Sequence, residues 1–149
     1  MGFFRKMNGF VALCLLISLC VVFSCGKEPK TGKLEITETS FSMEKDGKYS
    51  QSLNVTGKIR NVGPYDVKHV VVTGRCNSCS EIMVSGKWFA TQTVKSEDQK
   101  DIIDYIPSGV EESFSFEDIA YYYNTDAVDP DSYPEGLEVY VESFETVPD

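Results

Sequence analysis

Short runs of strand-forming residues, separated by turn residues, fill the sequence from Leu34 onward. None of them continues with a helical period over the roughly twelve residues that a helix prediction requires. Turn signals such as Asp46-Gly47 and Gly63-Pro64 separate the runs. The seven expected strands cover residues 34–43, 53–59, 67–73, 82–89, 100–105, 112–116 and 137–144. Seven short strands at this spacing predict an all-β fold, a β-sandwich of about seven strands.

Two neighbouring segments are less regular than the expected strands. Residues 116–123 fit either a strand or a short helical turn, because aromatic residues follow one another without a clear period. Residues 124–136 combine carboxylates with two prolines, which predicts a long acidic loop.

The first 24 residues have the composition of an export signal. Arg5 and Lys6 are followed by an apolar run over residues 10–24, and this part of the chain has no acidic residue. The run is shorter than the roughly 20 apolar residues that a membrane-spanning helix needs. The alternative is an uncleaved anchor, in which Cys14, Cys20 and Cys25 are simply small apolar residues.

The apolar run ends in Val22-Phe23-Ser24-Cys25, which resembles the lipobox of bacterial lipoproteins. This resemblance implies cleavage before Cys25 and attachment of lipid to its sulfur. Two or three acyl chains on one residue anchor a protein stably to a membrane. Because Gly26 follows the cysteine, similarity to the sorting rules of Gram-negative bacteria favours the outer membrane, with the domain in the periplasm or on the surface.

The predicted organisation therefore has three parts. Residues 1–24 are the signal peptide, 25–33 are the lipidated cysteine and a flexible tether, and 34–149 are the sandwich domain. The tether prediction rests on two glycines and a lack of apolar side chains.

The exported part is strongly acidic. The whole chain has 14 basic and 23 acidic residues, and its leader contains two of the basic residues and none of the acidic ones. Lys100 is the last basic residue, so the C-terminal third has no cation. Because nucleic-acid binding depends largely on Lys and Arg, this charge argues against a nucleic-acid partner.

Residues 53–61 (Leu-Asn-Val-Thr-Gly-Lys-Ile-Arg-Asn) and 65–72 (Tyr-Asp-Val-Lys-His-Val-Val-Val) resemble FxLYD-type and related immunoglobulin-like domains of bacterial exported proteins. The proline-glycine turn and phenylalanine strand at 106–114 look like the second element of that pattern. Residues 73–76 (Thr-Gly-Arg-Cys) follow the valine strand in place of the tripeptide that names the family. The resemblance implies an immunoglobulin-like sandwich and no particular ligand.

Cys76-Asn77-Ser78-Cys79 is the one local motif with chemical potential. In an oxidising compartment, two cysteines at this spacing predict a disulfide that closes a turn between two strands. The alternatives are a redox-active couple and half of a zinc site. The single histidine, His69, lies in the middle of an expected strand and is interpreted as a solvent-facing or hydrogen-bonding residue.

The acidic loop and the aromatic residues are weaker candidates for a site. Calcium prefers several oxygen ligands, which the loop offers as Asp126, Asp129, Asp131 and Glu135, whereas a rigid solvated loop explains the same residues. If exposed together, four tyrosines would form a binding patch for glycan or protein, namely Tyr121, Tyr122, Tyr123 and Tyr133. The alternative is that alternate rings fill the sandwich, as expected for Trp88.

No catalytic motif or cofactor site is predicted, because the sequence has one histidine, no Gly-x-Ser-x-Gly motif and no phosphate-binding loop. We therefore expect a membrane-anchored lipoprotein that is not an enzyme and needs no cofactor. Its sandwich is expected to be an interaction or accessory module of the cell envelope, with a protein or glycan partner. The alternative is a thiol-redox or metal-handling lipoprotein that uses Cys76 and Cys79.

Overall fold

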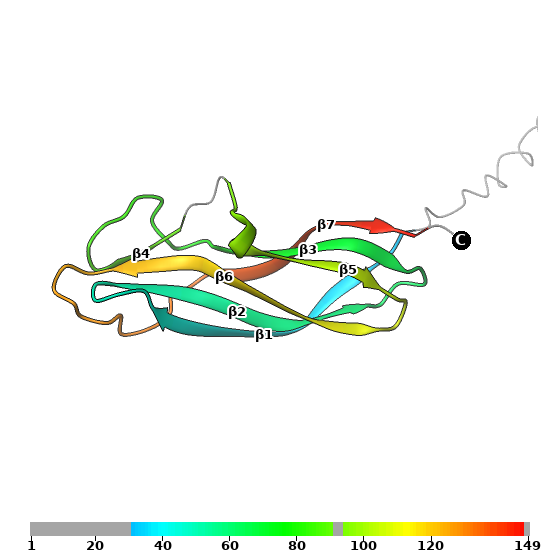
Figure 1. Cartoon of the computed structure of the whole chain (residues 1–149), viewed down its shortest axis with the longest axis horizontal. Coiled ribbons are helices and arrows are strands. Elements are labelled where there is room, and N and C mark those ends of the chain that lie inside the picture. Colours follow the sequence, from blue (N-terminus) through cyan, green and yellow to red (C-terminus); the bar gives the residue numbers. More distant parts are fainter. Residues whose placement is uncertain (1–30, 91–93, 148–149) are drawn as a thin grey trace, which may run out of the picture.

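The computed structural model describes residues 31–90 and 94–147, which form a two-sheet β-sandwich (Figure 1). The predicted signal peptide and Cys25 lie outside these residues. The described part contains seven strands, one short 3₁₀ helix (η1, Glu97–Gln99) and no α-helix. The predicted all-β sandwich is confirmed. The strands are β1 Leu34–Lys45, β2 Ser50–Asn61, β3 Val67–Cys76, β4 Lys87–Phe89, β5 Lys100–Ile106, β6 Glu111–Tyr123 and β7 Leu137–Thr146.

Both sheets are antiparallel. One has the strand order β1-β2-β6-β4 and the other has the order β5-β3-β7. The four-stranded sheet has the same spatial arrangement as the A-B-E-D sheet of immunoglobulin constant-type domains, but β5 of the other sheet comes between β4 and β6 in the chain, whereas D and E are consecutive. The middle strand of the second sheet is β3, the third strand of the chain, whereas in those domains it is the sixth strand, F.

The strand predictions differ from the structure mainly in two places. The ambiguous segment 116–123 belongs to a strand, because β6 continues to Tyr123 and pairs with β2 along this length. The predicted strand 82–89 is wrong over its first part, since only Lys87–Phe89 pairs with β6. The preceding residues form an exposed loop that ends at Gly86, where a φ of +76° turns the chain.

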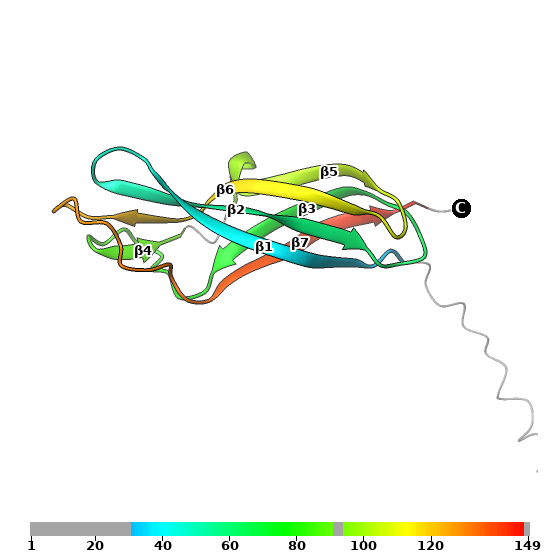
Figure 2. The same ribbon diagram turned by 90° about the horizontal axis from the view of Figure 1, so that it is seen from below.

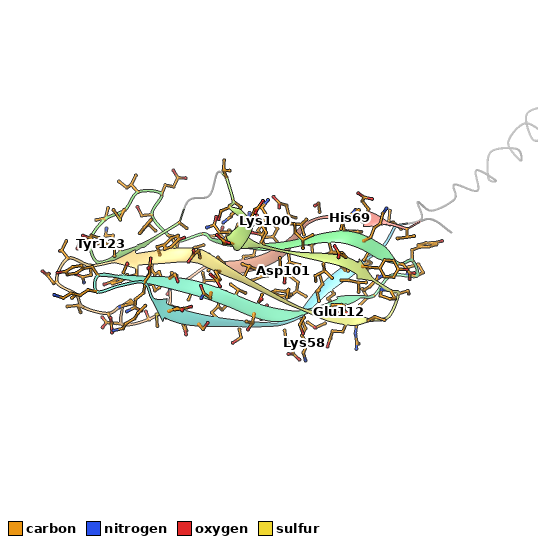
Figure 3. The ribbon with its side chains drawn as sticks, in the orientation of Figure 1. Lys58, His69, Lys100, Asp101, Glu112 and Tyr123 are labelled. Atoms are coloured by element: carbon orange, nitrogen blue, oxygen red, sulfur yellow. A yellow bond between two sulfur atoms is a disulfide. The ribbon has the colours of Figure 1, made fainter. Side chains whose placement is uncertain are left out.

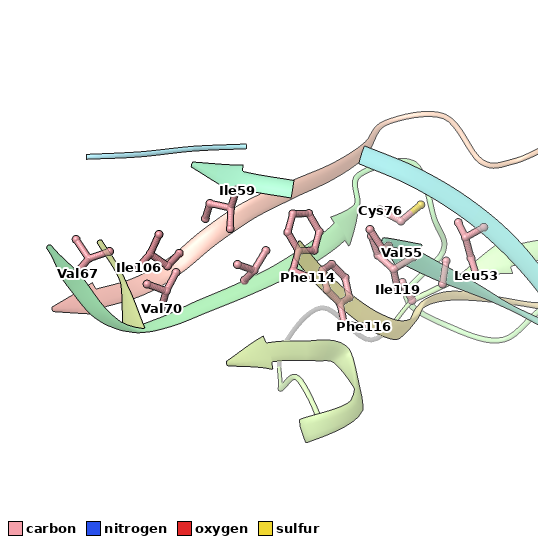
Figure 4. Packing of buried hydrophobic residues seen from close by; sticks show 13 residues of the cluster. Leu53, Val55, Ile59, Val67, Val70, Cys76, Ile106, Phe114, Phe116 and Ile119 are labelled. Atoms are coloured by element: carbon pink, nitrogen blue, oxygen red, sulfur yellow. The ribbon is translucent and has the colours of Figure 1, made fainter. Parts of the chain in front are cut away.

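The core lies between the sheets and is built from alternate residues of β2, β3 and β6 (Figure 4). Successive side chains of a strand point to opposite faces, so every second residue of these strands is available to the interior. The fully buried side chains include Leu53, Val55, Ile59, Val67, Val70, Val72 and Ile119. Trp88, expected in the core, is partly buried against this cluster.

Two glycines make room for large core side chains. A Cβ at Gly57 would lie 2.4 Å from Cζ of Phe114, and one at Gly74 would lie 2.4 Å from Cδ1 of Ile119. Both distances are too short for non-bonded carbon atoms, so each large side chain occupies the place of the missing Cβ. The close approach of β6 to its neighbour β2 and to β3 in the facing sheet therefore requires these glycines.

The ordered domain begins before Leu34. Gly32, predicted to belong to the tether, is buried, and its N–H donates to Oγ1 of Thr146 at 2.8 Å. The carbonyl of Lys33 accepts hydrogen bonds from the N–H groups of Val62 and Gly63. The last residues before β1 are therefore fixed to the same end of the sandwich as the end of β7.

Asn61 is a buried polar residue that ties three segments together. Its side-chain Nδ2 donates to the carbonyls of Tyr65 (2.8 Å) and Ile106 (3.1 Å), and its Oδ1 accepts from the N–H of Gly63 (3.1 Å). The side chain thus links backbone groups of the β2–β3 turn with the end of β5.

We predict that Asn61→Ala lowers the free energy of unfolding by about 2–4 kcal/mol, because it removes three hydrogen bonds made by one fully buried side chain. Chemical denaturation measures this change. The matched control is Asn77→Ala, whose exposed side chain makes a single long hydrogen bond with Glu138, and whose loss should cost less than about 0.5 kcal/mol. Equal losses in the two variants would contradict the role given to Asn61.

Candidate functional site

Different segments of the chain lie at the two ends of the sandwich (Figures 1 and 2). At one end lie the first described residues and the end of β7, joined through Gly32 and Thr146. At the other end lie the turn 46–49 and the loops 77–86 and 124–136, which we call the distal end. Every sequence-predicted site residue within the described ranges lies at or next to the distal end.

The disulfide closes the base of the loop 77–86. Cys76 is the last residue of β3 and is fully buried, and the structure bonds its sulfur to that of the partly buried Cys79. The next residue is fixed as well, because Ser80 N–H donates to the carbonyl of Trp88 and its own carbonyl accepts from the N–H of Ala90, both at 3.0 Å.

Three consecutive apolar side chains project from this loop. Ile82, Met83 and Val84 have exposed fractions of 70%, 60% and 37%. Hydrogen bonds hold the end of the loop, since Gly86 N–H donates to the carbonyl of Tyr123 at 2.8 Å. Sequence reasoning missed this feature because an apolar run of this length is also typical of a strand.

An open hollow of about 580 Å³ lies beside the loop. Its apolar lining comes from Cys79, Ile82, Val84, Trp88 and Pro134. The Nε1–H of Trp88 donates to the carbonyl of Ser132 at 3.1 Å, which fixes the loop 124–136 against β4. The hollow therefore lies between two loops that the same tryptophan connects.

The four candidate tyrosines do not form one patch. Tyr122 is only 8% exposed, and its ring lies 5.4 Å from that of Trp88. Tyr121 is partly buried and stacks on Phe89 at 5.6 Å. Tyr133 is 44% exposed, but its hydroxyl donates to the carbonyl of Phe41. Strand alternation in β6 places Tyr122 on the face opposite to Tyr121 and Tyr123, so the alternative interpretation describes Tyr122.

The acidic loop does not gather its carboxylates into a cation site. Asp129 accepts hydrogen bonds from Lys45 (2.9 Å) and from the side-chain amide of Gln51 (2.6 Å). Among the described residues, no three His, Cys, Asp or Glu side chains are grouped closely enough to hold a metal ion. The loop is instead fastened to the β1–β2 hairpin through Asp129.

A second open hollow, of about 690 Å³, is lined by residues of β1, β2, β5 and β6, including Lys58 and Asp101, whose side chains are labelled in Figure 3. Its charged groups already have partners. Lys58 donates to Glu38 at 2.9 Å, and Asp101 accepts the N–H of Ser115 at 2.8 Å. His69 is exposed elsewhere, in the irregular part of β3, with Nδ1 3.2 Å from Oε1 of Glu145.

Comparison with known proteins gives no match, whether to a family model, to a curated protein or to a solved structure. The resemblance to FxLYD-type domains therefore stays a prediction. Within the part of the chain that the structure describes, no helix has the length and apolar character needed to cross a membrane.

We predict that removing the disulfide with Cys76→Ala and Cys79→Ala lowers the free energy of unfolding by about 1–2 kcal/mol, because so short a loop loses little entropy on closure. Chemical denaturation of the double variant measures the change. Reduction of the unmodified protein is the matched control and should have an effect of similar size. No change in either experiment would contradict the stabilising role.

We also predict a loss of stability at alkaline pH that depends on Tyr121. Burial raises the pKa of its hydroxyl above the ordinary value of 10.0, and a hydrogen bond with Asp118 raises it further. The folded state holds this proton more tightly than the unfolded chain does. Stability is therefore complete below pH 10 and falls as the pH rises above it. Denaturation between pH 8 and about 11.5 should show a shallower decline in Tyr121→Phe; equal slopes would contradict the prediction.

Proposed function

We propose that this protein is a membrane-anchored lipoprotein whose β-sandwich is a non-catalytic interaction module of the cell envelope. The observation that carries the proposal is the placement of the two ends. Gly32, among the first described residues after the predicted lipidation site, is fixed at one end of the sandwich, and the disulfide-closed apolar loop lies at the other. An anchored protein would thus present the distal end away from its membrane.

The long strands set the reach of such a module. β2 contains 12 residues and β6 contains 13. At about 3.3 Å per residue, strands of this length extend about 40 Å. The distal end is therefore separated from the anchored end by roughly the thickness of a bilayer including its headgroups.

The acidic surface supports a protein or glycan partner over nucleic acid. The formal net charge is −9, and the loops 77–86 and 124–136 carry five carboxylates and no Lys or Arg, whereas the turn 46–49 contributes Lys48. Phosphate binding needs the opposite sign of charge. The excess of carboxylates in these two loops would also repel an anionic lipid surface.

The rival function is thiol-redox or metal handling by Cys76 and Cys79. Reactive cysteines usually lie exposed at helix N-termini or beside cations, which lower the thiol pKa. Cys76 instead ends a strand and is buried in the core cluster. Both facts favour a structural bond, and the state of the two thiols in the cell decides between the functions.

Intact mass spectrometry of the protein extracted from membranes tests the anchor. We expect a chain that begins at Cys25 and carries acyl groups, and we expect Cys25→Ser to abolish acylation. Cys20→Ser is the matched control and should leave the lipidated product unchanged, because Leu19 before Cys20 is a poor fit to the lipoprotein peptidase.

The same samples, when they are alkylated before reduction, test the alternative function of thiol-redox or metal handling. We expect no alkylation of Cys76 or Cys79. An unacylated chain that retains residues 1–24 would overturn the anchor, and alkylation of both cysteines would favour the redox or metal function.

A further inference from the structure

The two sulfurs of the disulfide differ in their access to solvent. Cys76 has an exposed fraction of 0% and belongs to the buried core cluster, whereas Cys79 is only partly buried. Cys79 also lines the open hollow of about 580 Å³ beside the loop 77–86, and Cys76 does not. Because thiol–disulfide exchange needs direct contact between the attacking sulfur and a disulfide sulfur, this difference decides which sulfur a thiol can reach.

The hollow also provides a favourable charge for an attacking thiolate. Lys87 is exposed and is the one charged side chain in its lining. Glu81 and Glu135 are close to lining residues in the sequence but are not part of the lining. The thiolate is the species that attacks, and a nearby cation favours it over the neutral thiol.

The backbone keeps the two cysteines together when the bond opens. The N–H of Asn77 donates to the carbonyl of Gly136 at 2.9 Å, and the N–H of Ser80 donates to the carbonyl of Trp88 at 3.0 Å. These hydrogen bonds fix the turn that joins the pair, whose Cα atoms are 5.4 Å apart. The sulfur of Cys76 therefore stays beside Cys79 and can displace a group attached to it.

From these observations we infer that the disulfide exchanges with thiols of other molecules through Cys79 alone. The incoming thiolate attacks Sγ of Cys79 and forms a new S–S bond with it. The bond to Cys76 breaks, and its electron pair goes to the Cys76 sulfur, which takes up a proton from solvent. A second reagent thiol can then attack the reagent sulfur of this mixed disulfide, which releases Cys79 as a thiol, or the Cys76 thiolate can displace the first reagent and restore the original bond.

This reactivity goes beyond the proposed interaction function and is compatible with a structural bond. Opening at Cys79 generates the Cys76 thiolate in the core, where burial away from water penalises its charge. Cys76 is therefore a poor leaving group, and an oxidising compartment favours return to the closed bond. The bond opens from one side only, and only when a thiol enters the hollow.

Single-cysteine variants of the full-length protein test which sulfur reacts. Cys76→Ala keeps the Cys79 thiol and Cys79→Ala keeps the Cys76 thiol, and each is treated with glutathione disulfide below its melting temperature. Peptide mass spectrometry measures the adduct at the retained cysteine. We expect the adduct at Cys79 to form about tenfold faster or more, because Cys79 reaches the hollow and Cys76 is buried. Equal rates, or a faster reaction at Cys76, would overturn the inference.

The unmodified protein gives a second measurement that does not depend on the folding of a variant. It is incubated with reduced glutathione, and acid then stops the exchange by protonating the thiolates. Peptide mapping in acid should find glutathione on Cys79. Glutathione on Cys76, on both cysteines in equal amounts or on neither would contradict exchange through Cys79.

Lys87→Gln in the Cys76→Ala background tests the charge of the hollow. The rate with the anionic glutathione disulfide should fall about threefold, whereas the rate with the neutral reagent dithiodipyridine should stay nearly the same. Lys48→Gln is the matched control, because Lys48 is also an exposed cation of the distal end and does not line the hollow. An equal loss with both reagents, no loss, or the same loss in Lys48→Gln would overturn the role given to Lys87.

Discussion

The structure depends on the contact between β6 of one sheet and β3 of the other. Within its own sheet, β6 is paired with β2 and β4. Phe114, Phe116 and Ile119 project inward from β6 and meet the valines of β3 (Figure 4). Burial of each such side chain contributes about 1.5–3 kcal/mol. The contact forms only because Gly57 and Gly74 leave space for Phe114 and Ile119. Most of the distal end is attached to this framework, since the loops 77–86 and 124–136 extend from β3 and β6 and β4 pairs with β6.

The sequence was most informative where burial follows a simple period. Alternating apolar residues in β2 and the valines of β3 predicted strands, because one face of each strand must be buried. The segment 82–86 has the same apolar character and yet forms a loop. Its conformation is set by a local disulfide, by a left-handed glycine and by hydrogen bonds to Trp88 and Tyr123, and the contact with Tyr123 is one that local composition does not contain.

In the candidate site, too, some features could be predicted from local sequence and others depend on the folded structure. The cysteine pair could be recognised from its spacing, and the acidity of residues 124–136 could be read directly. Which tyrosines are exposed depends on the register of β6, because a shift of one residue exchanges the two faces of a strand. Tyr122 is consequently buried beside Trp88, and the exposed apolar surface comes from Ile82, Met83 and Val84 instead. The position of Asp129 likewise follows from its contacts with Lys45 and Gln51, far away in the sequence.

Trp88 is the only tryptophan of the chain, and it lines the hollow while its indole N–H is bonded to Ser132. Indole emission responds to the polarity around the ring and to the loss of this hydrogen bond. The molecule therefore contains an optical reporter at the surface where its two longest distal loops meet. Any event that fills the hollow, separates the loops or opens the disulfide changes the surroundings of this one indole, with no background from a second tryptophan.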